Sequence, residues 1–183
     1  MWWVGQFFGL VALIGDAITF HFKTRRRIMH AYTVACLAWV LSFAFLGAYT
    51  GMALMVLSGL NIWGSYKLSK WSRNKQLSIL LLLLVLAFSL TILTWHGWPS
   101  MFALAGWSLM TLSVWSKQTQ DMRRFGVAMA ASWLVYSTAV FSIFSMISDA
   151  ITLVSNVIAL AHNRESVSRR HLSRTIVHTR KKS

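Results

Sequence analysis

The sequence has very few acidic residues and only one proline. Asp and Glu account for four of 183 residues against 18 Lys and Arg, and charged residues make up 12% of the chain. A soluble domain of this length needs about twice that share of charged residues. An ordinary soluble protein is therefore excluded, and the 56% content of hydrophobic residues, with 10 Trp and 11 Phe, indicates a membrane protein.

The chain also lacks the residue sets that catalysis or metal binding requires. Its single cysteine, Cys36, excludes a disulfide framework and a cysteine metal site. The six histidines are scattered along the chain and show no ligand spacing. No nucleophile stands beside a base, and there is neither a glycine-rich phosphate loop nor a carboxylate pair on one segment. We therefore predict a protein that is not an enzyme and that uses no cofactor and no metal.

Seven apolar segments follow one another along the chain. They are residues 2–22, 28–46, 51–68, 77–95, 98–115, 125–144 and 147–162. Each is close to the ~20 residues that cross the hydrocarbon core as a helix. They predict an all-α membrane protein with seven transmembrane helices in one domain, residues 1–163, followed by a basic cytoplasmic tail, residues 164–183.

All Lys and Arg residues lie in the first, third and fifth connections or in the tail. Because short basic loops stay in the cytoplasm, the N-terminus is expected outside and the C-terminus inside. We expect contacts with anionic lipid headgroups from Arg25, Arg26, Arg27, Lys70, Arg73, Arg123 and Arg124. The charges lie between apolar runs and not along a helical stripe, which argues against a nucleic-acid partner.

The segments divide into two groups of three around a different fourth segment. Residues 77–95, LSILLLLLVLAFSLTILTW, are apolar all round, as expected of a helix that faces lipid. Other segments carry stripes of small or polar residues, such as Gly5, Gly9 and Ala12, which let helices approach closely. Residues 2–68 and 98–162 are triplets of the same orientation, and an offset of 95 residues pairs Asn61 with Asn156. We predict a 3+1+3 arrangement of parallel triple-helix repeats with residues 77–95 as spacer.

Two amides are candidates for a substrate-binding site between the repeats. Asn61 and Asn156 lie about midway along their segments, with hydroxyls nearby at Ser58 and Thr152. An amide both donates and accepts hydrogen bonds, which suits a hydroxylated or zwitterionic solute. It also suits a hydrogen bond between two helices, so both interpretations stay open.

Two carboxylates complete the candidate site. Asp16 should face the interior because a charge inside the bilayer is costly, and it either pairs with a residue of the first loop or forms a proton or cation site. Asp149 is expected in the first turn of the last helix, where the helix dipole would stabilise its charge. We hypothesise that Asn61 and Asn156 face one central cavity, with Asp16 near its inner end and Asp149 near its outer mouth.

Several stretches resemble a known family. QFFGLVALIGDAITF, the loop KTRRR, FAFLGAYTGMALMVLSGLN and SMISDAITLVSNVIALAHNR are similar to the YgjV-like family of bacterial inner-membrane proteins. More remotely, the three-one-three plan resembles the SWEET and PQ-loop (MtN3-like) carriers, and this resemblance implies that Asn61 and Asn156 line a substrate pocket. The helix-kinking prolines of those carriers are missing here, since the only proline is Pro99.

The sequence leaves two functions open. The first is a multi-pass protein of the bacterial inner membrane that binds or transports a small polar solute between the two repeats. The alternative is a structural or accessory membrane protein whose polar stripes only pack helices together. Whether the chain forms a homo-oligomer also stays open.

Overall fold

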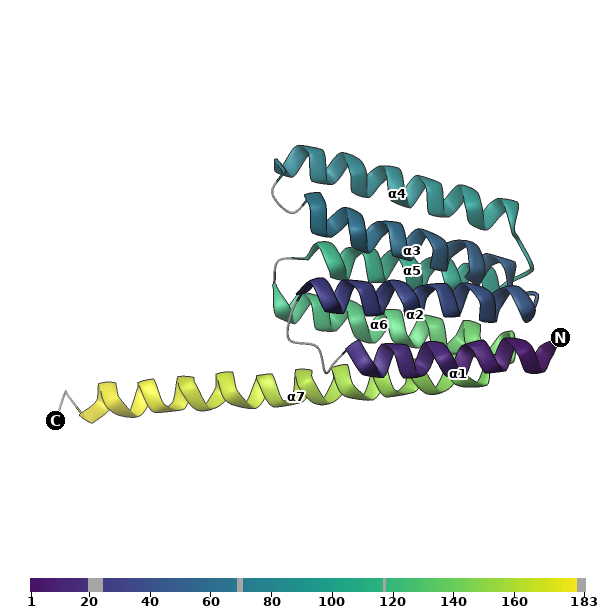
Figure 1. Cartoon of the computed structure of the whole chain (residues 1–183). Coiled ribbons are helices and arrows are strands. Elements are labelled where there is room, and N and C mark those ends of the chain that lie inside the picture. Colours follow the sequence, from purple (N-terminus) through teal and green to yellow (C-terminus); the bar gives the residue numbers. More distant parts are fainter. Residues whose placement is uncertain (20–24, 69–70, 117, 181–183) are drawn as a thin grey trace.

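A computed structural model describes the backbone of residues 1–19, 25–68, 71–116 and 118–180 and, apart from some at helix ends, the side chains as far as His162. These residues form seven helices and no strand (Figure 1). The helices are α1 (Trp2–Thr19), α2 (Arg25–Phe45), α3 (Tyr49–Leu68), α4 (Arg73–Leu93), α5 (Pro99–Trp115), α6 (Thr119–Ala139) and α7 (Ile143–Arg180). The prediction of an all-α protein with seven helices is confirmed for the described residues.

The last helix is longer than predicted. The final apolar segment was expected to end at residue 162, but α7 continues as a helix to Arg180. Within the described residues, α4 and residues Ile143–His162 of α7 are long and apolar enough to cross a membrane by length and composition. Shorter apolar helical stretches cover Trp2–Ile18 and His30–Phe45.

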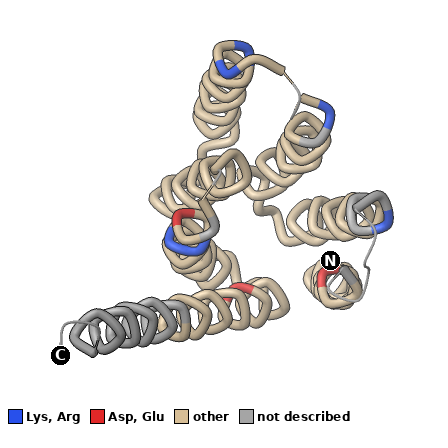
Figure 2. The backbone as a smooth tube through the Cα atoms, turned by 90° about the vertical axis from the view of Figure 1, so that its left-hand side faces the viewer, with Lys and Arg blue, Asp and Glu red and all other residues tan. Residues whose placement is uncertain are grey.

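Six helices form a closed ring. Along it, α1 packs on α2, α2 on α3, α3 on α5, α5 on α6, α6 on α7, and α7 returns to α1. Helix α4 lies outside this ring and packs on α3 and α5. Figure 2 looks along the helices and shows α4 at the margin of the bundle. The ring brings the first and the last helix together, because α1 contacts α7.

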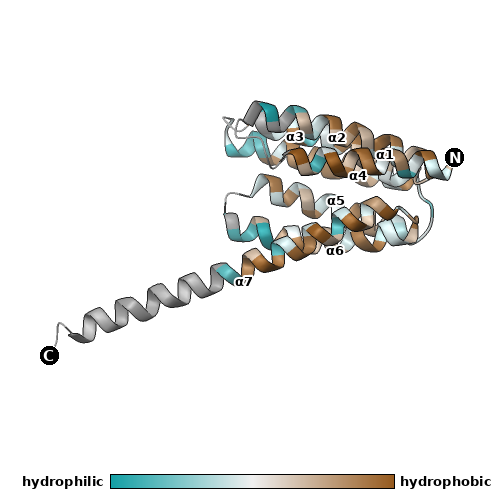
Figure 3. Ribbon diagram, turned by 60° about the horizontal axis from the view of Figure 1, so that its bottom comes forward, coloured by the Kyte–Doolittle hydropathy of each residue, from teal (hydrophilic) through white to brown (hydrophobic). Residues whose placement is uncertain are grey.

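The two ends of the bundle differ in charge. Described Lys and Arg residues lie where α3 ends and where α2, α4 and α6 begin (Figure 2). We call this the basic end; it includes Arg27, Lys67, Arg73, Lys75, Arg123 and Arg124. Hydrophilic residues gather at this end in Figure 3, while apolar residues cover the length of the helices. This pattern is the one expected of a bundle in a bilayer.

Helix α4 has a largely exposed apolar surface. Leu81, Leu82 and Val85 are all more than 60% exposed, and only Ala87 and Thr91 of this helix are buried. A soluble protein rarely leaves a continuous apolar surface of this kind uncovered. The expectation that the fourth segment has little to pack against therefore agrees with the structure.

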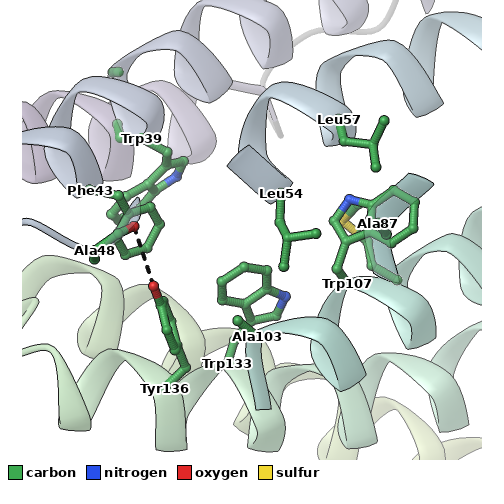
Figure 4. Packing of buried hydrophobic residues seen from close by; sticks show 13 residues of the cluster. Trp39, Phe43, Ala48, Leu54, Leu57, Ala87, Ala103, Trp107, Trp133 and Tyr136 are labelled. Atoms are coloured by element: carbon green, nitrogen blue, oxygen red, sulfur yellow. Dashed lines mark hydrogen bonds between the residues drawn. The ribbon is translucent and has the colours of Figure 1, made fainter. Parts of the chain in front are cut away.

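Aromatic side chains fill the centre of the bundle (Figure 4). The ring centroid of Trp133 lies 6.3 Å from that of Phe43 and 5.6 Å from that of Tyr136. The hydroxyl of Tyr136 accepts a hydrogen bond from the Gly51 N–H at 2.8 Å and lies 3.4 Å from the Ala48 carbonyl oxygen. These contacts join α6 to the start of α3 across the ring.

Small residues allow the close packing that the sequence predicted. A Cβ at Gly5 would lie 2.9 Å from Leu46, and one at Gly9 would lie 3.2 Å from Ser42 and 3.3 Å from Phe144. Ala12, one turn further, is fully buried. The stripe on the first helix therefore faces α2 and α7, as expected.

Two glycines of α3 make a matched pair for testing this packing. A Cβ at Gly51 would lie 2.7 Å from the Tyr136 hydroxyl, whereas a Cβ at Gly59 would meet nothing within 4 Å. We expect Gly51→Ala to lower the free energy of unfolding by about 1 to 2 kcal/mol because Tyr136 must move. Gly59→Ala should leave it unchanged or raise it by up to about 1 kcal/mol, since alanine favours the helix. SDS-induced unfolding in detergent measures both, and equal effects would contradict the packing described here.

Candidate functional site

A cavity of about 110 Å³ lies inside the ring of six helices. The two carboxylates of the apolar segments, Asp16 of α1 and Asp149 of α7, are half-buried and lie on its wall. Polar lining also comes from Ser58, Ser145, Ser148 and Thr152, and apolar lining from Tyr32, Cys36, Trp39, Met55, Met110, Met129 and Trp133. All six ring helices therefore contribute to one cavity, on whose wall two carboxylates lie.

Asp16 is positioned by α2. The Trp39 indole Nε1–H donates a hydrogen bond to Asp16 Oδ2 at 2.9 Å. The stripe of Gly5, Gly9 and Ala12 brings α1 close to its neighbours, and Asp16 continues the same face one turn later. The carboxylate thus lies on the inner face of α1, as the sequence predicted.

Asp149 is held by hydroxyls and does not cap a helix. Its Oδ2 accepts hydrogen bonds from Ser137 Oγ at 2.7 Å and from Ser145 Oγ at 3.4 Å. Because α7 begins at Ile143, Asp149 lies beyond the first turn, where unsatisfied backbone N–H groups end. The capping interpretation is therefore wrong, and this carboxylate belongs to the cavity.

Further cavities adjoin the central one in the direction of the basic end. The next, of about 680 Å³, shares Asp16, Thr152 and other residues with it and is also lined by Ser155 and Asn156. A third, of about 540 Å³, shares Ser155 and reaches Arg123 and His162. The three cavities follow α7 from Asp149 to the basic end of the bundle.

At the opposite end, a glutamine joins α1 to the turn between α6 and α7. Gln6 Nε2 donates a hydrogen bond to the Phe141 carbonyl oxygen at 2.8 Å, and its Oε1 accepts one from the Ile143 N–H at 3.2 Å. Gln6 is buried, and Phe141 has a positive φ of 54° that fits the tight turn. The junction of α1 and α7 is therefore bonded at this end, whereas near the basic end the same helices line a cavity.

Asn61 does not line this cavity. It is fully buried, its Nδ2 donates to Thr111 Oγ1 at 3.1 Å, and its Oδ1 accepts from Trp115 Nε1 at 2.9 Å. Both polar atoms of the amide are used between α3 and α5. The hypothesis that Asn61 and Asn156 face one cavity is wrong, because the Asn61 amide bonds side chains of the neighbouring helix α5 instead.

Asn156 lies in a different setting. Its Nδ2 donates to the Thr152 carbonyl oxygen of the preceding turn at 2.9 Å. A Cβ at Gly126 would lie 3.1 Å from the amide, so this glycine lets α6 pass close to Asn156. Asn156 lines the second cavity together with Thr152, while Ser58 and Thr152 both line the first.

One family model matches residues 3–166 of the chain, and its description is that of a bacterial inner membrane protein, Imp-YgjV. The chain belongs to this family. The predicted YgjV-like resemblance is thereby confirmed, and the protein is one of the bacterial inner membrane. No curated protein and no solved structure matches the chain. The remote resemblance to SWEET carriers therefore rests on the sequence pattern alone.

The basic residues of this YgjV-like protein differ in their surroundings. Arg27, Arg73 and Arg124 are exposed, and Arg124 lies 3.7 Å from Asp121. Arg123 Nη1 instead donates to the Ala159 carbonyl oxygen at 2.9 Å, which ties α6 to α7. The predicted headgroup contacts of Arg25, Arg26 and Lys70 fall on side chains outside the described residues. For the exposed arginines, headgroup contact stays a prediction.

Sequence reasoning missed the residues that hold the carboxylates and close the ring. Gln6, Trp39 and Ser137 each bond a group on another helix, but none belongs to a spacing pattern. A buried glutamine in an apolar span was a usable signal, because a polar group in lipid needs a partner. The tryptophan and serine carried no such signal, since both are common where helices meet.

The amide of Asn61 provides a test of packing against solute binding. We expect Asn61→Leu to destabilise this YgjV-like protein, because it leaves the Thr111 and Trp115 groups without their partner. A double-mutant cycle of Asn61→Leu and Thr111→Val should give a coupling energy of about 0.6 to 2 kcal/mol in SDS unfolding. A coupling near zero would contradict the bond between α3 and α5.

Proposed function

We propose that this protein crosses the inner membrane seven times and binds a small polar solute in its central cavity for passage across the membrane. One observation carries the proposal: all six ring helices line a cavity with two carboxylates, and further cavities follow α7 to the basic end. A carboxylate inside a bilayer costs free energy, and such residues commonly mark a binding site or pathway for a solute.

We also propose that the ring consists of two triplets, α1 to α3 and α5 to α7, with α4 as spacer. The contacts support this arrangement, because α3 packs on α5 as α7 packs on α1. A two-fold rotation that exchanges the triplets would exchange these two junctions. Helix α4 packs outside, as a helix that only restores the orientation of the second triplet would.

The two junctions differ in how they are bonded. Between α3 and the second triplet, Thr50 and Ser100 pair at 3.0 Å at one end and Asn61 bonds Thr111 at the other. Between α7 and α1, hydrogen bonds of Gln6 close one end. At the other end, Asn156 bonds Thr152 of its own helix and no described residue of α1. The α1 and α7 junction is therefore the one able to admit a solute from the basic end.

The charge distribution sets the orientation of the proposed spans. A reporter that is active only in the cytoplasm should work when fused after Ser72 or Ser183, because the basic end should face the cytoplasm. The same reporter should be inactive when fused after Tyr49 or Trp98, at the opposite end. Activity after Tyr49 would contradict the proposed topology.

A ligand screen tests the proposed function. The purified protein is heated in detergent with sugars, amino acids, organic acids and amines, because a ligand of the folded state raises the midpoint of unfolding. We expect at least one class to stabilise it, and Ser148→Leu, which places a larger side chain on the walls of both cavities, to remove that effect. Asn61→Leu is the matched control, since it should lower stability but leave the shift by ligand intact.

The accessory alternative predicts a different result. The Asn61 bonds show that a polar residue of these helices can serve packing alone. If no class of solute stabilises the protein and Ser148→Leu leaves it unchanged, the cavity has no ligand and the packing function is the better account.

A further inference from the structure

We propose that the solute is a small organic cation, an amine or quaternary ammonium compound, that is bound between Asp149 and Asp16. This inference rests on the proposed function and adds the chemical class of the solute. It comes from the wall of the central cavity, which carries a carboxylate of α1 and a carboxylate of α7.

Charge is the first argument. The described residues that line the first and second cavities include two aspartates and no Lys, Arg or His. The hydrogen-bond partners of Asp149 are the neutral hydroxyls of Ser137 and Ser145. A carboxylate in a low-dielectric interior is stabilised far more by an opposite charge than by neutral donors. A cation in the cavity would supply that charge to Asp149, whereas an anion would meet a like charge there.

The remaining walls favour an organic cation over a metal ion. Trp39, Trp133 and Tyr32 line the central cavity, and aromatic rings attract ammonium groups as well as their methyl or methylene carbons. Thioether sulfurs of Met55, Met110 and Met129 add soft, polarisable surface. Hard metal cations prefer six or more oxygen ligands, and no group of three or more His, Cys, Asp or Glu gathers among the described residues.

Cavity size limits the solute. The central volume of about 110 Å³ is well below the ~300 to 1,000 Å³ of pockets for drug-sized ligands. It therefore suits a compound of a few heavy atoms. The adjoining cavity of about 680 Å³ offers a wider space on the side of the basic end, with Asn156 and Ser155 as hydrogen-bonding groups. A small amine with a hydroxyl or amide could bond these groups on its way to the carboxylates.

A charge series of nearly equal size tests the proposal. Ethanolamine, ethylene glycol and glycolate differ mainly in charge, and tetramethylammonium and sodium test the preference for an organic cation. Binding to the full-length protein in detergent is measured by calorimetry and by the unfolding midpoint. We expect ethanolamine or tetramethylammonium to bind at least 10-fold more tightly than the glycol, the glycolate or sodium. Asp149→Asn, which keeps shape and removes charge, should weaken that binding at least 10-fold, with Asp121→Asn at the basic end as a control without effect.

The outcomes separate this inference from the function on which it rests. Equal or tighter binding of the glycol, the glycolate or another neutral or anionic solute would overturn the cation but leave a solute-binding protein. Binding of sodium alone would overturn the organic cation. Failure of every compound, charged or neutral, would overturn both. If Asp149→Asn does not fold, Asp16→Asn replaces it, because Asp16 lies on the same cavity wall.

Discussion

Replacement of Trp133 by Ala is expected to lower the free energy of unfolding by about 3 to 5 kcal/mol. Trp133 is only 4% exposed and packs against both Phe43 and Tyr136. On its own side of the ring it lies against Gly106, where a Cβ would come within 2.8 Å of the indole. Removal of the ring would leave a hole where α2, α5 and α6 meet.

A second tryptophan provides the control. Trp3 is 78% exposed near the N-terminus, so Trp3→Ala removes the same side chain from the surface of the bundle. We expect it to change the free energy of unfolding by less than about 1 kcal/mol. SDS unfolding of both variants in detergent makes the comparison. Similar losses for Trp133 and Trp3 would mean that the aromatic cluster is not the core.

Gly9→Leu is expected to open the ring, at a cost of about 3 kcal/mol or more. A Cβ at Gly9 already lies 3.2 Å from Ser42 Oγ of α2 and 3.3 Å from Phe144 Cβ of α7. The three further carbons of leucine have no room between these helices, so α1 must move away from one of them. Because this junction closes the ring, the variant should also lose ligand binding.

Val11→Leu is the matched control on the same helix. Val11 is 38% exposed, and an added methylene there faces away from both neighbours. It should leave unfolding and ligand binding unchanged. Asp16→Asn should also fold better than Gly9→Leu, since it keeps the shape of the side chain. Normal stability of Gly9→Leu would show that α1 does not hold α2 and α7 together.

The seven helices were predictable because the apolar segments are long and separated by charged or turn-forming residues. The helix that begins at Arg73 illustrates this: its uniform leucine run predicted a peripheral position, and the structure places it outside the ring. The stripe of small residues on α1 similarly predicted which face of this helix packs against its neighbours. Helix ends were less predictable, as the extension of α7 to Arg180 shows. A polar helix lacks the periodic apolar residues from which a helix is predicted in a sequence.

The candidate site was predictable only in part. Asp16 and Asp149 were identified because acids are rare in apolar segments, and both line one cavity. Asn61 looked equivalent to Asn156, but its partners Thr111 and Trp115 lie on a helix 50 residues or more away in sequence. Which neighbour satisfies an amide depends on helix rotation and on distant residues. A spacing pattern contains neither.

Access of water to the central cavity tests the account most directly. Thr152 lines the first and second cavities, whereas Thr111 is fully buried between α3 and α5. In a Cys36→Ala background, each is changed to Cys and treated in membrane vesicles with a membrane-impermeant thiol reagent. We predict that Thr152→Cys reacts from the side of the basic end, that a bound solute slows the reaction, and that Thr111→Cys does not react. If Thr152→Cys is as protected as Thr111→Cys, the cavity is not a solute site.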